Sequence, residues 1–94
     1  MYFYLAANIA AGLDGVRRKL TPPAMSGADP YASDAPKLPT SLWEAVEALE
    51  KDDFFPEVFT PSFVTFVTSM KRNEINRFHS EVTDWEMREY FEFF

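Results

Sequence analysis

The sequence has no cysteine, a single histidine and only three glycines among its 94 residues. Without cysteine the chain forms no disulfide and has no thiolate that could bind zinc or attack a substrate. His79 has no Ser or Asp in a recognisable catalytic arrangement with it, so we interpret it as a surface or partly packed side chain. Gly12 and Gly15 lie in a helical pattern with no strand before them, which excludes a phosphate-binding loop. The sequence therefore predicts no catalytic, cofactor-binding or metal-binding residue.

Basic residues are also scarce, because nine Lys and Arg stand against fifteen Asp and Glu, a net charge of −6. Such a chain lacks the positive field that gathers at nucleic acid or at anionic lipid, so neither partner is expected. The apolar residues 1–13 have no basic residue before them and fall short of the roughly 20 that a spanning helix needs. Hydrophobic residues nevertheless make up 47% and aromatics 17%, too many for a disordered chain.

The first apolar stretch predicts a helix that continues to about Leu20. A continuous stripe recurs at spacings of three and four along it: Tyr2, Leu5, Ile9, Leu13, Val16 and Leu20. Small residues occupy the other side, so the helix is apolar nearly all round as far as Asp14, a pattern typical of a helix inside something larger. The basic residues 17–19 suit the negative end of a helix dipole, and Pro22 and Pro23 would end the helix.

Residues 21–39 are rich in Pro, Ala, Ser and Asp without an apolar period, which predicts an irregular surface loop. Tyr31 is the only aromatic residue in it. One interpretation is that its ring anchors the loop on the body of the protein. The other is that Tyr31 is exposed and modifiable.

Beyond the loop, Ser41 and Glu44 form the pattern of a capping box at the start of a helix. The expected buried stripe of this helix is Leu42, Ala45, Val46 and Leu49. Asp53 is expected to cap a short helical turn, and Thr60 with Pro61 to begin a longer helix that runs to about Val82. Strand-favouring residues fill that helix, yet its apolar residues repeat by three and four: Phe63, Phe66, Val67 and Met70.

A second capping box, Thr83 to Glu86, predicts an amphipathic helix through the last residues of the sequence. One face of it is aromatic and apolar, with Met87, Tyr90, Phe91 and Phe94 together. Because exposed apolar patches of this kind mark contact surfaces, we expect a partner to cover this face. The fold class that follows is all-α, about four helices with one long irregular loop, in one domain of residues 1–94 that the resemblance described next makes a single partial domain.

Four blocks of the sequence resemble the C-terminal end of the glutamine synthetase family. They are Tyr4 to Ala7 with Ala10 to Leu20, Leu38 to Leu49, Lys71 to His79, and Val82 to Tyr90. Their order and spacing agree with the family across essentially the whole chain. The Thr-Asp-Trp-Glu sequence at residues 83–86 and the short loop look most like the glutamate–amine ligases, such as γ-glutamylpolyamine synthetase.

The resemblance implies a cytoplasmic, ATP-dependent ligase of nitrogen metabolism that joins ammonia or an amine to the γ-carboxylate of glutamate with magnesium or manganese ions. The family's metal, nucleotide and catalytic residues all lie before the position of Met1, so none is carried onto this chain. The expected partners are therefore the rest of such a chain or other copies of it. The first helix packs on the catalytic sheet in this family, which would explain why it is apolar on nearly every side.

The resemblance also implies two surface roles. In double-ring members of the family the C-terminal helix inserts into another subunit, so the expected oligomer contacts are Trp85, Met87, Tyr90, Phe91 and Phe94. Regulated members are adenylylated on a loop tyrosine, which makes Tyr31 a candidate modification site, although its neighbours differ from the family's usual pattern. The alternative function is a free-standing helical interaction module that binds through its first helix and its aromatic tail.

Overall fold

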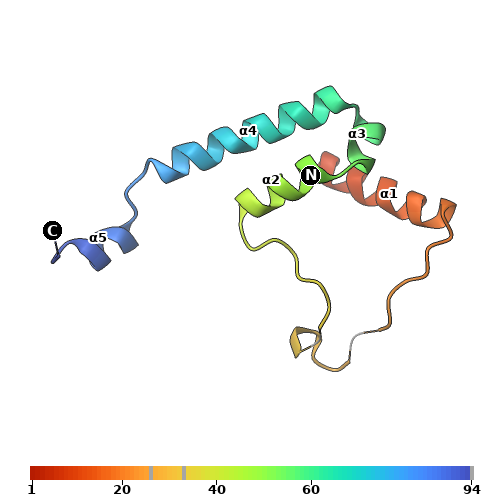
Figure 1. Ribbon diagram of the computed structural model, residues 1–94, viewed down its shortest axis with the longest axis horizontal. Coiled ribbons are helices and arrows are strands. Elements are labelled where there is room, and N and C mark those ends of the chain that lie inside the picture. The colour runs from red at the N-terminus through yellow and green to blue at the C-terminus, as the bar shows by residue number, and fades with distance from the viewer. Residues whose placement is uncertain (26, 33, 94) are drawn as a thin grey trace. The chain divides into compact units, whose positions relative to one another are not determined.

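The computed structural model describes residues 1–25, 27–32 and 34–93, which form helices joined by turns and loops. In chain order they are α1 (Tyr2–Arg17), the single 3-10 turn η1 (Pro30–Ala32), α2 (Leu42–Lys51), α3 (Phe54–Phe59), α4 (Pro61–His79) and α5 (Asp84–Tyr90). The described residues include no strand. The expected all-α class is confirmed, with the short turn α3 added to the four main helices (Figure 1). The chain divides into two compact units, Met1–Leu38 and Pro39–Phe94.

In the first unit, α1 forms as predicted but ends at Arg17, before the prolines. The backbone of Lys19 is left-handed, with φ 53°, and the N–H of Leu20 donates to the carbonyl of Gly15 across it. This is a Schellman termination with lysine where glycine is usual. Arg18 donates from Nε and Nη2 to one oxygen of Asp14, at 2.9 and 2.7 Å. The loop that follows is irregular apart from η1, as predicted for it.

No residue of α1 is buried, although the helix is the most continuously apolar segment of the chain. The exposed fractions along its apolar stripe are 86% for Tyr2, 49% for Leu5, 63% for Ile9, 55% for Leu13, 76% for Val16 and 54% for Leu20. The small residues on the other side, Ala6, Ala7 and Ala10, are only partly exposed. The apolar stripe is thus an uncovered surface.

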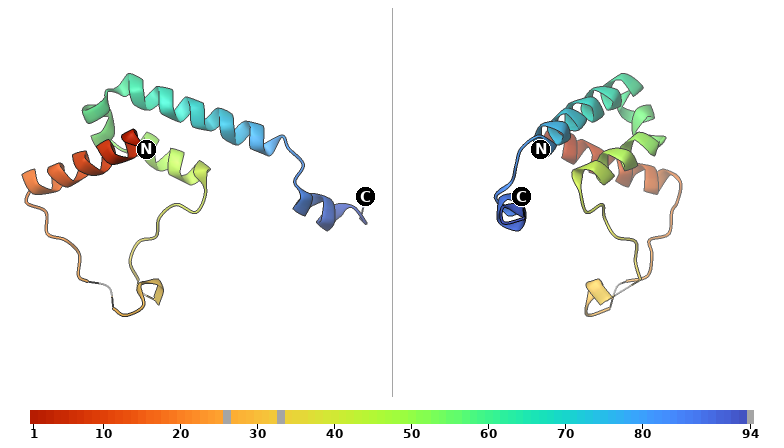
Figure 2. Two further views of the ribbon diagram at one scale, coloured as in Figure 1. Left: turned by 180° about the vertical axis from the view of Figure 1, so that it is seen from behind. Right: turned by 60° about the vertical axis from the view of Figure 1, so that its left-hand side comes forward.

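In the second unit, α2 and α4 run antiparallel, with α3 at the turn between them (Figures 1 and 2). The core between them is small, and its buried residues are Val46, Val64, Thr68 and Ile75. The Thr68 hydroxyl is satisfied by donating to the carbonyl of Thr65 at 3.1 Å. A row of neighbouring rings extends this core toward α3: Phe54, Phe55, Phe59 and Phe63. α2 and α4 are therefore held by tertiary packing, unlike α1.

The helix predicted over α4 is confirmed, but it ends at His79 and turns a different face to the core. Val64, Thr68 and Ile75 are buried at spacings of four and seven, while Phe66 is 62% and Met70 44% exposed. Phe63 and Val67 of the predicted stripe are partly buried, so only half of that stripe contributes to the packed side of the helix. In α2 the expected stripe is likewise reduced to Val46 and the partly buried Leu49, because Leu42 and Ala45 are exposed.

The helix caps follow the predictions in part. Ser41 accepts the N–H of Glu44 at 3.1 Å, but the Glu44 carboxylate accepts from the N–H of Thr40 at 2.9 Å, one residue before the expected partner. Asp53 is the N-cap residue of α3 as predicted, but its side chain makes no cap bond, and the carboxylate of Asp52 accepts the N–H of Phe55 instead. The predicted cap at Thr60 and the capping box at Thr83 are both confirmed.

Candidate functional site

The second unit is tied together by a charged cluster on its surface. Arg72 on α4 donates two hydrogen bonds to the carboxylate of Glu50 on α2, at 2.9 and 2.7 Å. Its guanidinium carbon lies 4.6 Å from the centroid of the Trp43 ring, and the Trp43 indole N–H donates to Glu47 at 3.0 Å. The hydrogen bond from Arg72 holds the pKa of Glu50 below its ordinary value and raises the pKa of Arg72 in turn. The cluster fixes the register of the two helices.

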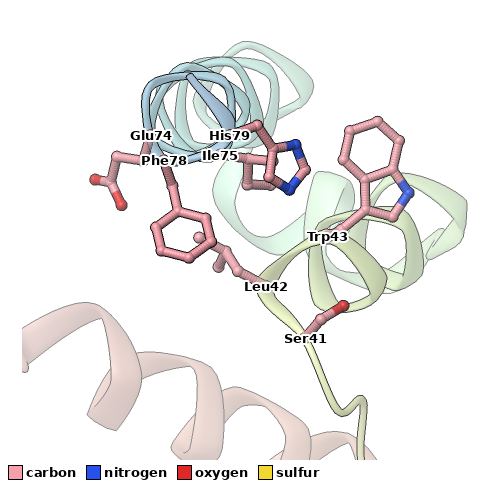
Figure 3. Close-up of a pocket in the computed structure, with 7 residues that line it drawn as sticks. All are labelled: Ser41, Leu42, Trp43, Glu74, Ile75, Phe78 and His79. Atoms are coloured by element: carbon pink, nitrogen blue, oxygen red, sulfur yellow. The ribbon is translucent and has the colours of Figure 1, made fainter. Parts of the chain in front are cut away.

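Beside this cluster lies a cleft of about 340 Å³, between the start of α2 and the last turns of α4. It is lined by Ser41, Leu42, Trp43, Glu74, Ile75, Phe78 and His79. Figure 3 shows Phe78 and Leu42 on one side and Trp43 on the other, with His79 and Ile75 between them in this view. Three of its walls are exposed apolar side chains, Leu42 at 44%, Trp43 at 43% and Phe78 at 65%. The cleft is an open apolar surface.

The structure brings Ser41 and His79 to the same cleft, which spacing in the sequence did not reveal. Their roles there are structural in all the described contacts. The Ser41 oxygen is the cap of α2, and the His79 ring lies 6.0 Å from that of Phe78. Glu74, the carboxylate in the lining, is paired with Lys71 at 3.0 Å. No contact among the described residues links a nucleophile to a base.

A second uncovered surface belongs to α5. The exposed fractions of its large side chains are 56% for Trp85, 54% for Met87, 48% for Tyr90 and 77% for Phe91. The rings of Trp85 and Tyr90 meet edge to face with centroids 6.0 Å apart. Helix α5 ends at Tyr90, earlier than predicted, and Phe94 lies outside the described residues. Met87 and Phe91, four residues apart, share one face as expected for a helix turn.

Tyr31 lies in η1, where its N–H is bonded to the side chain of Asp29 at 3.0 Å. Its side chain is 92% exposed. The interpretation that the ring anchors the loop is therefore wrong for this structure, because a ring packed on the body would lose most of its exposure. Modification of Tyr31 stays a prediction.

The acidic and histidine side chains of residues 1–25, 27–32 and 34–93 are scattered. Among the described residues, no three His, Asp or Glu side chains come close enough together to hold one. The acids of α2 are instead used locally, Glu44 at the helix cap, Glu47 on Trp43 and Glu50 on Arg72. Among the described helices, none is both long enough and apolar enough to cross a membrane.

An all-α segment with a small core and two uncovered apolar surfaces is the kind of structure expected of one part of a larger assembly. Comparison with protein families identifies the family. Residues 1–90 match the family described as glutamine synthetase, catalytic domain, and the chain belongs to this family. The resemblance stated from the four sequence blocks is thereby confirmed.

The individual relatives cover both branches of the family. The chain is 38% identical to a gamma-glutamylanilide synthase from an Acinetobacter species, over 96% of its own length and 20% of the relative's. It is 37% identical to a glutamate–methylamine ligase from Methyloversatilis universalis, over 99% and 23%, and 32% identical to a glutamine synthetase from Methanococcus voltae, over 95% and 22%. The chain thus spans about a fifth of the length of these relatives. No solved structure matches it.

Proposed function

We propose that this chain forms the C-terminal helical part of a ligase that uses ATP to join ammonia or an amine to the γ-carboxylate of glutamate. The observation that supports this role is the state of α1, which is apolar yet buries no residue. An exposed apolar surface of this kind is usually an interaction site, and in the proposed assembly the rest of the catalytic domain buries it. The length ratio agrees, since the chain spans about a fifth of its relatives.

In this proposal the chemistry belongs to the remainder of the enzyme. ATP and magnesium or manganese would bind there, together with the glutamate and the amine, in the cytoplasm. The present chain contributes packing, through α1 and the α2–α4 pair, and contacts between subunits, through α5. Its two units would be parts of one catalytic domain.

The oligomer contact is proposed for one set of side chains, called the tail stripe here: Trp85, Met87, Tyr90, Phe91 and Phe94. Complete burial of the last four would contribute roughly 6–12 kcal/mol, at 1.5–3 kcal/mol each. Association of two proteins costs about 4–15 kcal/mol before side chains are ordered. The tail stripe alone is therefore too weak to hold an oligomer, and it acts together with other contacts between subunits.

The proposal is tested by rescue of a truncated relative. The gamma-glutamylanilide synthase from Acinetobacter, shortened by the fifth that matches this chain, is produced with and without the 94-residue protein. We expect γ-glutamyl amide formation only when both are present, and none from the 94-residue protein alone. Replacing Ile9 by Asp puts a charge on the face that the sheet should cover, so this variant should not rescue activity.

Rescue that is equally good with Ile9→Asp would contradict the packing role of α1. Complete absence of rescue, together with a chain that is helical and monomeric by itself, would favour the alternative of a free-standing helical interaction module. Phosphate release by the 94-residue protein alone, in the presence of ATP, glutamate and an amine, would overturn the assignment of the chemistry to the remainder of the enzyme.

A further inference from the structure

His79, the single histidine of the sequence, borders two hollows of the second unit. One is the α2–α4 cleft, where Figure 3 shows the imidazole between Phe78 and Trp43 in this view. The other is a hollow of about 360 Å³ at the joint between α4 and α5, lined by His79, Ser80, Glu81, Val82, Glu86, Met87, Tyr90 and Phe91. The imidazole therefore lies between an apolar surface and a surface that contains carboxylates.

The charged groups that face this imidazole are carboxylates. Helix α2 lines the cleft with residues 41–43, none of which is charged. Helix α4 contributes Glu74, which is already ion-paired within that helix at 3.0 Å. The joint contributes Glu81, and α5 contributes Glu86 beside Tyr90, whose phenol is a group without charge near neutral pH. A positive ring is thus favoured at the joint, and a neutral ring in the apolar cleft.

The ring of His79 can move from one hollow to the other. It is exposed, and no hydrogen bond to another described residue holds it in the cleft. Its contact with the ring of Phe78 is loose, with 6.0 Å between the centroids. His79 is also the last residue of α4, close to the carbonyls that form the negative end of the helix dipole. The dipole adds to the attraction of a positive ring at the joint.

We propose that His79 is a pH-sensitive joint between α4 and α5. The neutral imidazole lies against the apolar cleft, as in this structure. The protonated imidazole turns toward Glu81 and Glu86 and draws α5 against the end of α4. Histidine changes its charge near physiological pH, and glutamate carboxylates are still ionised where it does so. Because the contact needs the protonated ring, it is present in mild acid and is lost as the pH rises.

The tail stripe shares this hollow, because Met87 and Phe91 line it and are 54% and 77% exposed. In the closed joint, the end of α4 in the same copy covers both side chains. In mild acid fewer tails are then available to another subunit. This consequence rests on the function proposed for the tail stripe, whereas the joint itself does not.

The test is amide exchange in α5, measured by NMR on the 94-residue protein and on a His79→Gln variant at the same pH. The amides of Met87 and Phe91 are suitable reporters, because both are hydrogen-bonded within the α5 segment. At about pH 5.5, where an ordinary histidine is largely protonated, they should exchange about threefold more slowly in the unchanged protein. At about pH 7.5 the two proteins should exchange alike.

Two double variants identify the partners of the ring. Glu81→Gln with Glu86→Gln removes both carboxylates of the joint and keeps the capping box, in which glutamine can replace glutamate. Glu89→Gln with Glu92→Gln is the matched control, because it removes the same charge and neither residue lines the hollow. At about pH 5.5 the first pair should exchange like His79→Gln, and the second pair like the unchanged protein.

Equal exchange of the unchanged protein and His79→Gln at the lower pH would overturn the proposal. A difference of the same size at both pH values would also overturn it, since the ring would then only pack at the joint. Equal effects of the two double variants would do the same. The measurement needs neither the ligase reaction nor a second copy, so failure of the rescue leaves its result unaffected, and absence of a pH effect leaves the packing role of α1 unaffected.

Discussion

Helices α1 and α4 show opposite relations between composition and burial. The first thirteen residues of the chain contain no charged side chain, yet no residue of α1 is buried. Helix α4 contains Lys, Arg, Glu and two Asn residues, yet it supplies Val64, Thr68 and Ile75 to the small core. Apolar content therefore does not predict burial within this chain. What decides burial is whether a partner helix is present, and α2 and α3 provide one for α4.

The difference matters for stability as well. Short isolated helices are marginal in water, and most helical stability in proteins comes from packing of an apolar face. Helix α4 has such packing, while α1 relies on its own hydrogen bonds, its Schellman termination and the Asp14–Arg18 pair. We expect the second unit to be the more stable one in the isolated protein.

The largest predicted effect compares two isoleucines. Ile75 is 5% exposed and Ile9 is 63% exposed. Ile75→Ala should lower the free energy of unfolding of the second unit by about 2–5 kcal/mol, as deletion of buried methyl groups usually does. Ile9→Ala in the isolated protein should change it by less than about 0.5 kcal/mol.

Thermal and urea unfolding followed by circular dichroism measure both variants. Equal destabilisation by the two would show that α1 is packed as tightly as α4 in the isolated protein, and would contradict the expected difference between the two helices. The same two variants can be compared in the rescued synthase. There Ile9→Ala should also become destabilising, because the side chain at position 9 then packs against the sheet.

A smaller effect is expected at the two non-glycine residues that have a positive φ among those the structure describes, one in each unit. Thr60 has φ 76° at the junction of α3 and α4. Thr60→Gly should stabilise the second unit by about 1 kcal/mol, because relief of backbone strain exceeds the few tenths lost with the cap. Thr60→Ala keeps the strain and loses the cap to Phe63, so it should destabilise the unit. The midpoints of urea unfolding show whether each variant is more or less stable than the unchanged protein.

Lys19, with φ 53°, gives the matching change in the first unit. Lys19→Gly should increase the helix content of α1, since glycine suits the left-handed position that ends the helix. The unfolding of the second unit should not change. NMR chemical shifts of the Cα atoms report each helix separately, and a shared response of both units would indicate that they unfold together.

The smallest effect concerns pH and the tie between Glu50 and Arg72. The folded-state pKa of Glu50 lies below its ordinary value because Arg72 donates to it. Its contribution to stability is therefore fully present above the pKa of the unfolded state and is lost as pH falls through the folded-state pKa. Glu50→Gln should be slightly less stable than the unchanged protein at neutral pH and equal to it in acid.

Because both side chains are about one-third exposed, salt should reduce this difference further. Unfolding curves of the two proteins at neutral and acid pH, with and without salt, test it. A difference that grows in acid would have the wrong sign and would mean that the pair does not stabilise the unit.

Much of the fold was predictable because the signals are local. Capping patterns at Ser41, Thr60 and Thr83 and the apolar period of residues 63–70 located three helices. The buried face of α4 was not predictable in this way, since its apolar residues spread over a wider sector than the buried face and the position of α2 selects Val64, Thr68 and Ile75. The early end of α1 depends on a left-handed lysine, a position at which glycine is the usual signal.

The candidate site, like the fold, was predictable from the sequence only in part. The tail stripe is contiguous in sequence, so the pattern of Met87, Tyr90 and Phe91 was visible as an amphipathic helix. The cleft was missed because its walls come from residues 41–43 and 74–79, which only the pairing of α2 with α4 brings together. Arg72 contacts both Glu50 and Trp43, and these contacts fix the pairing of the two helices. Because they join residues far apart in the sequence, no local pattern predicts them.

The most direct test of the central claim is hydrogen exchange of the α1 amides in the 94-residue protein at monomeric dilution, compared with the same protein bound to the truncated synthase. We expect rapid exchange along α1 in the free protein and strong protection in the complex, with the amides of α2 and α4 protected in both states. Equal and strong protection of α1 in the free monomer would show that its apolar face is already covered, and would contradict the claim that this helix is built to pack on the rest of a ligase.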